Sequence, residues 1–375
     1  MQGSDILVDA LGGLVRIRLD FADHEFDEDR FREFTGPWRD AAPSSSEPAG
    51  DVVRPVAEMV WRFPDENGLA GSIAELSTYA TLAAIEARRG TLLMLHAAGI
   101  ADESGRVAAF IGPSGRGKTT LARALGAAYG YVTDETVGIE ANGTVHPYRK
   151  PLSVIRPERD YKEQIAPSVL GLMDLPAGML NLGALVLVSR VEDLEGPPVI
   201  SSLGLCHALA AIVPEVSYLA DLDRPLQMVA GLVDRCGAFK QVTYKDAAQV
   251  LPLVPELLAR EEPEFWDVVL PSNALDGVRS PYGDEVFVPA LVVDAVETGG
   301  QTAILDINRM VHVLDGVGPV VWRSVCDGLD FAGLVREIDE LFGAPPEQPL
   351  EDAIVGILGE LADVGLLVRT SAARS

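Results

Sequence analysis

The chain has 375 residues, of which 48% are hydrophobic, and its 56 Asp and Glu against 30 Lys and Arg give a net charge of −26. A chain of this length can bury a large core and is expected to form two or three domains. So strong a negative charge argues against bulk binding to nucleic acid or to an anionic membrane.

The cysteines and the apolar runs indicate the compartment. Cys206, Cys236 and Cys326 lie far apart without a C-x-x-C pair, which favours a reducing environment and neither a zinc site nor a disulfide framework. The N-terminal residues show no basic segment followed by a long apolar stretch, so no signal peptide is expected. No apolar run reaches the roughly 18 residues that suggest a membrane span. We therefore expect a cytoplasmic protein.

The first segment, 1–90, is expected to be a β-rich lead-in followed by a helix. Residues 13–21 alternate between apolar and polar side chains, as a half-buried strand does. Ser72 and Glu75 have the spacing of a capping box, which predicts a helix from there to about Arg89. We expect this helix to pack on the domain that follows.

A buried strand is predicted at residues 92–100, which are apolar except for His96. A single histidine in an apolar strand is more often a hydrogen-bonded core residue than a catalyst, and the pattern by itself leaves both interpretations open. The strand leads directly into the most informative stretch of the chain.

Residues 112–119 read Gly-Pro-Ser-Gly-Arg-Gly-Lys-Thr and match the phosphate-binding pattern G-x-x-x-x-G-K-[ST]. The context fits, because the apolar run 107–111 predicts a strand before the loop and residues 120–128 are rich in helix formers. Glycines let successive backbone N–H groups point at phosphate oxygens, while the lysine reaches the β- and γ-phosphates and the threonine ligates Mg²⁺. The residues expected to contact the nucleotide are Gly112, Ser114, Gly115, Arg116, Gly117, Lys118, Thr119 and Thr120.

An acidic pair, Asp134 and Glu135, follows sixteen positions after Lys118. Only one predicted helix separates it from the loop, so it is expected at the end of the very next strand. One carboxylate there could hold Mg²⁺ and the other could accept a proton from an attacking hydroxyl. The sequence does not decide which acid is the base, and a solvated acidic turn is the alternative.

The segments 95–98, 112–119, 131–139 and 147–153 together resemble the HPr serine kinase/phosphorylase-like P-loop family. They are most similar to members from clusters that make ribosomally synthesised, modified peptides, including lasso-peptide kinases. The resemblance implies an α/β P-loop core that uses ATP and Mg²⁺ to phosphorylate a hydroxyl. It assigns phosphate contact to Lys118, the metal to Thr119 and Asp134, and the base position to Glu135 with His96 near it.

Two departures bear on the substrate. The second acid is Glu135, where the family has Asp, and the Glu-x-Arg-Gly-x-Gly stretch of true HPr kinases is absent, which argues against HPr as substrate. In so acidic a chain, local positive groups must attract ATP. The candidates are Lys118, Arg116 and the pair Arg149 and Lys150, although that pair could equally be solvated.

The rest of the nucleotide domain, expected over 91–260, is less informative. Residues 182–188 predict another buried strand. Residues 203–260 are expected to be mostly helical, with one strand at 239–244. A linker is predicted over 261–281.

The last segment, 282–375, is expected to form a separate module. Strand-like runs at 291–296, 303–307 and 310–314 precede three predicted helices, which is a winged-helix-like arrangement. Residues 281–375 hold 5 Lys and Arg against 16 Asp and Glu, a net charge of −11. DNA binding is therefore not expected, because a surface that follows phosphates needs the opposite charge.

Residues 302–325 and the closing pattern L-x-x-L-x-x-x-G-L-L resemble the PqqD-like peptide-recognition module. In that family a leader peptide adds as a strand beside the third strand and packs on the third helix, here 352–364. A structural cap without a ligand is the alternative. The resemblance assigns peptide binding to Met310, Val311, His312, Val313, Leu314, Ile357, Glu360 and Leu361.

These features predict an ATP- and Mg²⁺-dependent kinase for a Ser or Thr of a ribosomally made precursor peptide whose leader the C-terminal module holds. Tethering by the leader would raise the local concentration of the acceptor. An alternative is an ATP-binding accessory protein that presents the leader to another enzyme. A kinase whose C-terminal module serves regulation or dimerisation is a third reading. The expected partner is a peptide and neither nucleic acid nor membrane, while a homo-oligomer is left open.

Overall fold

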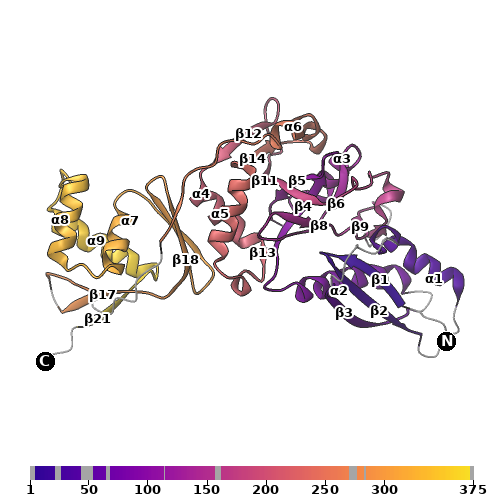
Figure 1. The fold of residues 1–375 in the computed structure, drawn as a ribbon, viewed down its shortest axis with the longest axis horizontal. Coiled ribbons are helices and arrows are strands. Elements are labelled where there is room, and N and C mark those ends of the chain that lie inside the picture. Colours follow the sequence, from indigo (N-terminus) through magenta and orange to yellow (C-terminus); the bar gives the residue numbers. More distant parts are fainter. Residues whose placement is uncertain are drawn as a thin grey trace. The chain divides into compact units, whose positions relative to one another are not determined.

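The computed structural model describes residues 5–21, 27–43, 54–64, 68–113, 115–156, 162–269, 277–282 and 284–371. The chain divides into two compact units, which are described separately (Figure 1). The first unit contains Met1–Leu203, Glu215–Asp223 and Gly231–Pro263, and the second contains Gly204–Pro214, Arg224–Ala230 and Glu264–Ser375. The sequence predicted domains that are each continuous in the chain. The second unit instead includes two short segments, Gly204–Pro214 and Arg224–Ala230, from the range 91–260 that was expected to form the nucleotide domain.

The first unit is built on a large mixed sheet, so the α/β class predicted from the sequence is confirmed. Its strand order is β12-β14-β11-β5-β4-β7-β8, with β6 and β13 also paired to β4. The strands are β4 (Leu93–Ala101), β5 (Arg106–Ile111), β6 (Gly130–Thr133), β7 (Thr136–Ile139), β8 (Thr144–His146), β11 (Leu180–Arg190), β12 (Val199–Leu203), β13 (Val216–Ser217) and β14 (Phe239–Tyr244).

Strand direction within this sheet decides where the site lies. Strand β5 runs parallel to β11, and β11 runs parallel to β14. Both β5 and β6 pair antiparallel with β4, so β5 and β6 run in the same direction. Their carboxyl ends therefore lie at the same edge of the sheet.

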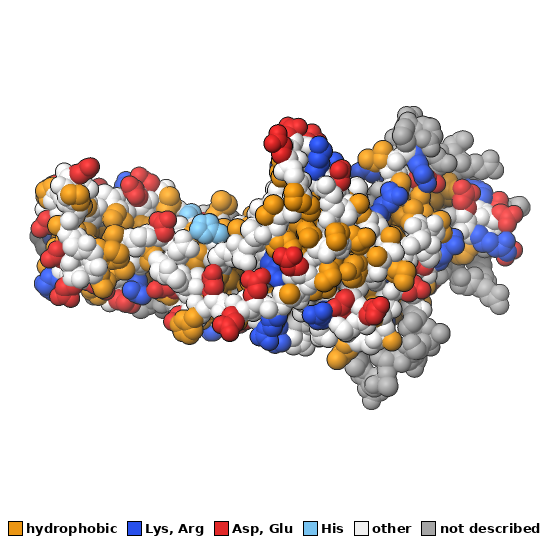
Figure 2. Space-filling model, turned by 90° about the horizontal axis from the view of Figure 1, so that it is seen from above, with side chains coloured by type: hydrophobic (Ala, Val, Ile, Leu, Met, Phe, Trp, Pro, Cys, Tyr) orange, Lys and Arg blue, Asp and Glu red, His pale blue; other side chains and the backbone are white. Residues whose placement is uncertain are grey.

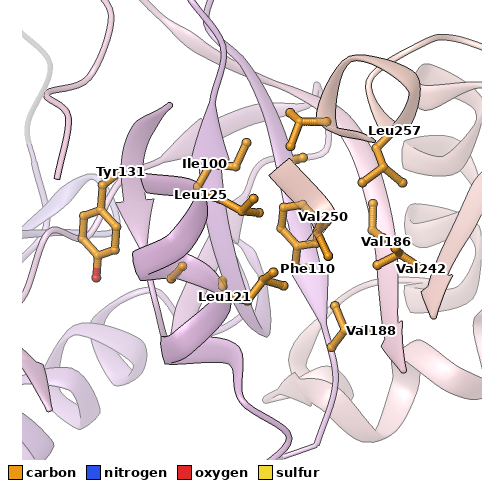
Figure 3. Close-up of a cluster of buried hydrophobic side chains, with 14 of the residues drawn as sticks. Ile100, Phe110, Leu121, Leu125, Tyr131, Val186, Val188, Val242, Val250 and Leu257 are labelled. Carbon is orange, nitrogen blue, oxygen red and sulfur yellow. The ribbon is translucent and has the colours of Figure 1, made fainter. Parts of the chain in front are cut away.

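Apolar side chains anchor the helix that follows the loop. Helix α3 (Lys118–Gly126) buries Leu121 and Leu125 in a cluster with Phe110 of β5 and Val186 of β11 (Figure 3). These side chains are all fully buried. Burial of this kind contributes about 1.5–3 kcal/mol per large aliphatic side chain, so the loop between β5 and α3 is held at both ends. The smaller elements of the unit are β9 (Leu152–Val154), β10 (Glu163–Ile165) and α6 (Val254–Leu257).

A second, smaller sheet of the first unit is formed by β1 (Asp5–Ala10), β2 (Gly13–Asp20) and β3 (Val56–Arg62). It packs with α2 (Leu69–Ala87), and α1 (Glu28–Thr35) precedes β3 in the chain. The predicted start of the α2 helix at Ser72 is wrong, because the helix begins at Leu69 after Gly68. The Ser72 amide already bonds to Gly68 O, and its hydroxyl accepts from Trp61 Nε1 at 2.9 Å, so it does not cap the helix.

The second unit contains the three strands and the three helices predicted for the C-terminal module. Strands β18 (Val292–Thr298), β19 (Gln301–Asp306) and β20 (Val311–Leu314) form an antiparallel sheet. Helices α7 (Gly318–Cys326), α8 (Phe331–Phe342) and α9 (Leu350–Asp363) follow. Trp322, Leu334 and Leu358, one from each helix, share one buried core with Ile304 of β19. The winged-helix-like arrangement stays a prediction.

Several elements of the second unit were not foreseen. Strand β15 (Asp267–Val268) joins the sheet beside β18, and a separate sheet contains β16 (Val278–Arg279), β17 (Glu285–Pro289) and β21 (Leu367–Ser371). Strands β15 and β16 lie within the range predicted as a linker. Helix α4 (Leu205–Ile212) packs on β18, β19 and β20, which is why its segment belongs to this unit. Helix α5 (Pro225–Cys236) begins in the second unit and ends in the first.

The surface reflects the acidic composition. On the face seen in Figure 2, carboxylate side chains are spread over both units and do not gather in one place. In the part of the chain that the structure describes, no helix combines the length and the apolar character needed to cross a membrane.

Candidate nucleotide-binding site

The phosphate-binding loop joins the buried end of β5 to the first turn of α3. Gly115 and Gly117 have φ angles of +81° and +89°, a conformation that side chains other than glycine rarely adopt. A Cβ on Gly112 would lie 2.8 Å from Val188 Cγ2, so this glycine is needed for close packing against β11. The predicted contact Ser114 lies outside the described residues. The backbone thus has the curl that a phosphate cradle requires.

Lys118 is held inside this loop. Its ammonium is in a residue only 6% exposed and donates to Gly112 O and, at 3.0 Å, to Pro113 O. Burial lowers the pKa of Lys118, while the carboxylates of Glu215, Glu135 and Asp134 act in the opposite direction. The lysine therefore points a partly buried donor into the loop, which is where the resemblance expects phosphate contact.

Asp134 follows the last residue of β6 and lies beside the start of α3, as the strand directions require. Its Oδ2 accepts from Thr119 Oγ1 at 2.9 Å, and its Oδ1 accepts from the buried Tyr131 hydroxyl at 3.1 Å. Only 5% of Asp134 is exposed. Both carboxylate oxygens are therefore oriented by neighbours.

Thr119 and Asp134 suit the magnesium ion that accompanies a nucleotide. Their side-chain oxygens already lie within hydrogen-bond distance of each other, and Mg²⁺ is typically bound by one or two carboxylates together with substrate phosphates and waters. No group of three or more His, Cys, Asp or Glu that could hold a metal occurs among the described residues. The metal would thus be held by these two side chains and the phosphates.

Glu135 is paired with a buried lysine. Lys150 Nζ lies 2.9 Å from Glu135 Oε2 and 3.5 Å from Asp134 Oδ1. Burial alone would lower the pKa of Lys150, but the charges of the two acids and the hydrogen bond to Glu135 raise it above its ordinary value. The sequence analysis did not distinguish Arg149 from Lys150 as candidates for attracting ATP. In the structure, Arg149 pairs with Asp174 at 2.8 Å, and of the two only Lys150 lines the pocket.

His96 projects from β4 toward the same place. Its side chain is 40% exposed, and its Nδ1 lies 3.9 Å from Glu215 Oε2. Burial, and next the charge of Lys118, lower the pKa of His96 below its ordinary value of 6.5, so the neutral imidazole dominates at pH 7. His96 is therefore not a core residue. Glu215 was missed because it belongs to none of the motifs and is placed beside His96 by the pairing of β13 with β4.

One pocket of about 550 Å³ is lined by His96, Lys118, Thr119, Asp134, Glu135 and Lys150, whereas Glu215 is not among its lining residues. It brings together every residue predicted to be catalytic. Arg116 is exposed on the loop and is not among the lining residues, and Gly112 supports the loop from behind. The lining residues are His96, Gly115, Gly117, Lys118, Thr119, Thr120, Arg123, Asp134, Glu135, Lys150, Ser153, Val154, Ile155, Lys162 and Arg190.

Arg190 is the most informative of the lining residues that the sequence did not single out. It stands at the carboxyl end of β11, and its Nε donates to Lys245 O at 3.2 Å. A Cβ on Gly117 would lie 3.8 Å from its side chain, so the guanidinium is beside the phosphate loop. No local pattern marks an arginine at a strand end as a ligand, and only the order β11-β5 places it there.

The residues predicted to bind a peptide lie in the second unit. Met310 is 60% exposed, and its N–H donates to Asp306 Oδ1 at 2.8 Å. His312 Nε2 lies 3.1 Å from Asp306 Oδ2. Leu361 is only 4% exposed and packs in the core, so it offers little surface to a ligand. The remaining residues are the partly buried Val311, Val313, Leu314 and Ile357 and the exposed Glu360.

No family model matches the chain, and no curated protein matches it. Among solved structures, the HPr(Ser) kinase/phosphatase from Coxiella burnetii is similar at 11% sequence identity with a TM-score of 0.23. The similarity covers 44% of this chain and 93% of that chain.

Proposed function

We propose that the chain is an ATP-dependent phosphotransferase that acts on a hydroxyl group. The observation that carries the proposal is the meeting of a glycine-curled phosphate loop, a buried loop lysine and two adjacent carboxylates in one pocket. Phosphoryl transfer needs positioning and charge stabilisation more than covalent chemistry, and these groups supply both.

Each side chain has a separate task. Lys118 and the loop N–H groups bind the β- and γ-phosphates. Thr119 and Asp134 would hold a magnesium ion, which would supply charge neutralisation on the phosphates. The acceptor oxygen bonds to the γ-phosphorus as the bond from that phosphorus to the ADP oxygen breaks. Glu135 takes the proton of the acceptor hydroxyl on its Oε1, because Lys150 occupies Oε2. The neutral His96 lies near enough to the pocket to orient the hydroxyl.

The acceptor in this proposal is a Ser or Thr of a ribosomally made precursor peptide, whose leader binds along β20. Support comes from the position of this strand at the end of the order β15-β18-β19-β20, with no further neighbour among the described strands. An open strand edge can accept an extended peptide through backbone hydrogen bonds. Binding at this edge would concentrate the acceptor for the pocket.

Co-expression with a candidate precursor peptide that carries a Ser or Thr after its leader tests this function. Wild-type protein is expected to add about 80 Da to the peptide, the mass of one phosphoryl group, detected by mass spectrometry. Glu135→Gln should remove this gain while leaving binding of a fluorescent ATP analogue within about threefold of wild type, since the ion pair of Glu135 is with Lys150 and Lys118 donates to loop carbonyls instead.

The outcomes separate the candidates. Turnover of ATP without any mass gain on the peptide would favour the accessory protein that only presents a leader. An unchanged mass gain in the Glu135→Gln variant would contradict the role of Glu135 as base.

A further inference from the structure

Lys150 is the most deeply buried cation that lines the pocket. It is 3% exposed, and its ammonium contacts Glu135, Asp134 and, at 3.3 Å, Pro151 O. A buried charge is tolerated only when it is paired and hydrogen-bonded. Its two ionic partners are Asp134, the proposed metal ligand, and Glu135, the proposed base.

The backbone before Lys150 is anchored so that the ammonium meets these acids. Tyr148 donates its N–H to Val132 O at 3.1 Å, which ties the segment to β6 just ahead of Asp134. The Tyr148 hydroxyl lies 3.2 Å from Thr81 Oγ1 of α2, and the ring is fully buried. The location of Lys150 is therefore set by two neighbouring elements and not by the acids alone.

The charge balance of the pocket makes this cation important. Asp134, Glu135 and Glu215 all act electrostatically on Lys118, and a nucleotide adds further negative charge. The other lining cations, Arg123, Lys162 and Arg190, are exposed to solvent, which weakens their effect. Without Lys150, the ammonium of Lys118 would be the only buried cation among the described residues that line the pocket, beside the carboxylates of Asp134, Glu135 and Glu215 and a bound triphosphate.

We propose that Lys150 is a positioning residue that bridges Asp134 and Glu135, so that its ammonium offsets the charge of two adjacent carboxylates that would otherwise repel the nucleotide. The bridge also fixes Glu135 through Oε2 and leaves Oε1 for the acceptor hydroxyl. This inference rests on the proposed function, because it explains how the acid pair and the nucleotide share one pocket.

A charge-compensation cycle tests the proposal. The affinity for a fluorescent ATP analogue with Mg²⁺ is measured for wild type, Lys150→Met, Glu135→Gln and the double variant. Lys150→Met should weaken binding by about tenfold or more, because it leaves the acids without their counter-charge. The double variant should recover to within about threefold of wild type, because it removes one of those acids.

Lys240→Met is the matched control. Lys240 is 2% exposed and lies 3.3 Å from Glu261 Oε1, and it donates to backbone carbonyls outside the pocket. This variant also removes a buried ammonium that is paired with a half-exposed glutamate, in the same unit. It should lower the unfolding temperature while leaving nucleotide affinity of the folded protein unchanged.

These measurements test the proposed role of Lys150 separately from the proposed function. Wild-type affinity in Lys150→Met, or a loss that Glu135→Gln does not repair, would overturn it and leave Lys150 a structural residue like Lys240. The unfolding temperature of the same four proteins without nucleotide is a second measurement. Lys150→Met should lower it, and adding Glu135→Gln should restore part of that decrease. If wild type binds nucleotide but transfers no phosphoryl group, the proposed function is wrong. The four nucleotide affinities then still test whether Lys150 bridges Asp134 and Glu135.

Discussion

At the scale of single residues, the site depends on carboxylates that differ in their surroundings. Asp134 is buried and oriented by Thr119 and Tyr131, whereas the Glu135 side chain is 43% exposed and bound by Lys150. A fixed, buried acid suits a metal ligand, and a more exposed acid can meet an incoming hydroxyl. The proposed function therefore gives the metal to Asp134 and the proton to Glu135, the roles that the family resemblance implies.

The lowered pKa of His96 predicts a pH dependence of stability. Above its ordinary value of 6.5 the imidazole is neutral in both folded and unfolded chains and contributes nothing. Below that value the unfolded chain takes up the proton more readily, so the folded state loses stability as the pH falls. The unfolding temperature of wild type should therefore fall relative to His96→Asn between about pH 7.5 and about pH 5.5. Thermal denaturation of both proteins in matched buffers measures this, and a constant difference across the range would contradict it.

At the scale of secondary-structure elements, the register of β20 defines what its edge offers. Asp306 N bonds to Met310 O at 3.0 Å, so these two residues form a hydrogen-bonded pair of the β19–β20 ladder. Opposite pairs alternate in antiparallel sheets. Val311 and Val313, which face Leu305 and Ala303, therefore form non-bonded pairs and direct their N–H groups away from β19.

Replacing Val313 with proline should weaken leader binding. Proline removes an outward N–H without taking a bond from the β19–β20 ladder, and edge strands tolerate it. We expect the affinity for a synthetic leader peptide to fall by about tenfold, measured by fluorescence anisotropy, with little change in unfolding temperature. Val313→Thr keeps the N–H and serves as control. Equal affinity of the proline variant and wild type would argue that the leader does not use this edge.

At the scale of the whole molecule, the two units exchange segments of chain. Helix α4 precedes Glu215 of the first unit, yet it packs on the β18, β19 and β20 strands of the second. Its buried residues include Leu205, Leu209 and Ile212. The C-terminal module is therefore not a simple appendage that can be cut away.

Truncation after Pro263 should destabilise the remaining chain. It removes the strands on which α4 packs and so exposes apolar residues of that helix to water. We expect the truncated chain to unfold about 5 °C or more below the full chain, or to aggregate. Differential scanning calorimetry and size-exclusion chromatography check this. A truncated chain that is monomeric and as stable as the full chain would show that α4 does not depend on this unit.

The parts of the fold that the sequence predicted well are local. Strand β14 has the predicted bounds, and the strand, loop and helix around residues 107–126 form as expected. Each depends on apolar periodicity or on glycines within about a dozen residues. The predicted helix start at Ser72 is wrong because the helix begins three residues earlier, at Leu69, and Trp61 of the preceding strand uses the serine hydroxyl.

The sequence by itself determined that a phosphate loop exists and that two carboxylates follow one helix later, because both facts depend on spacing along the chain. Only the tertiary structure decided that Lys150 and Arg190 line the same pocket and that Glu215 lies beside His96. These three come from separate segments, and their meeting depends on the order and direction of strands in the central sheet. Side chains far apart in sequence converge through strand pairing, which no local pattern of residues records.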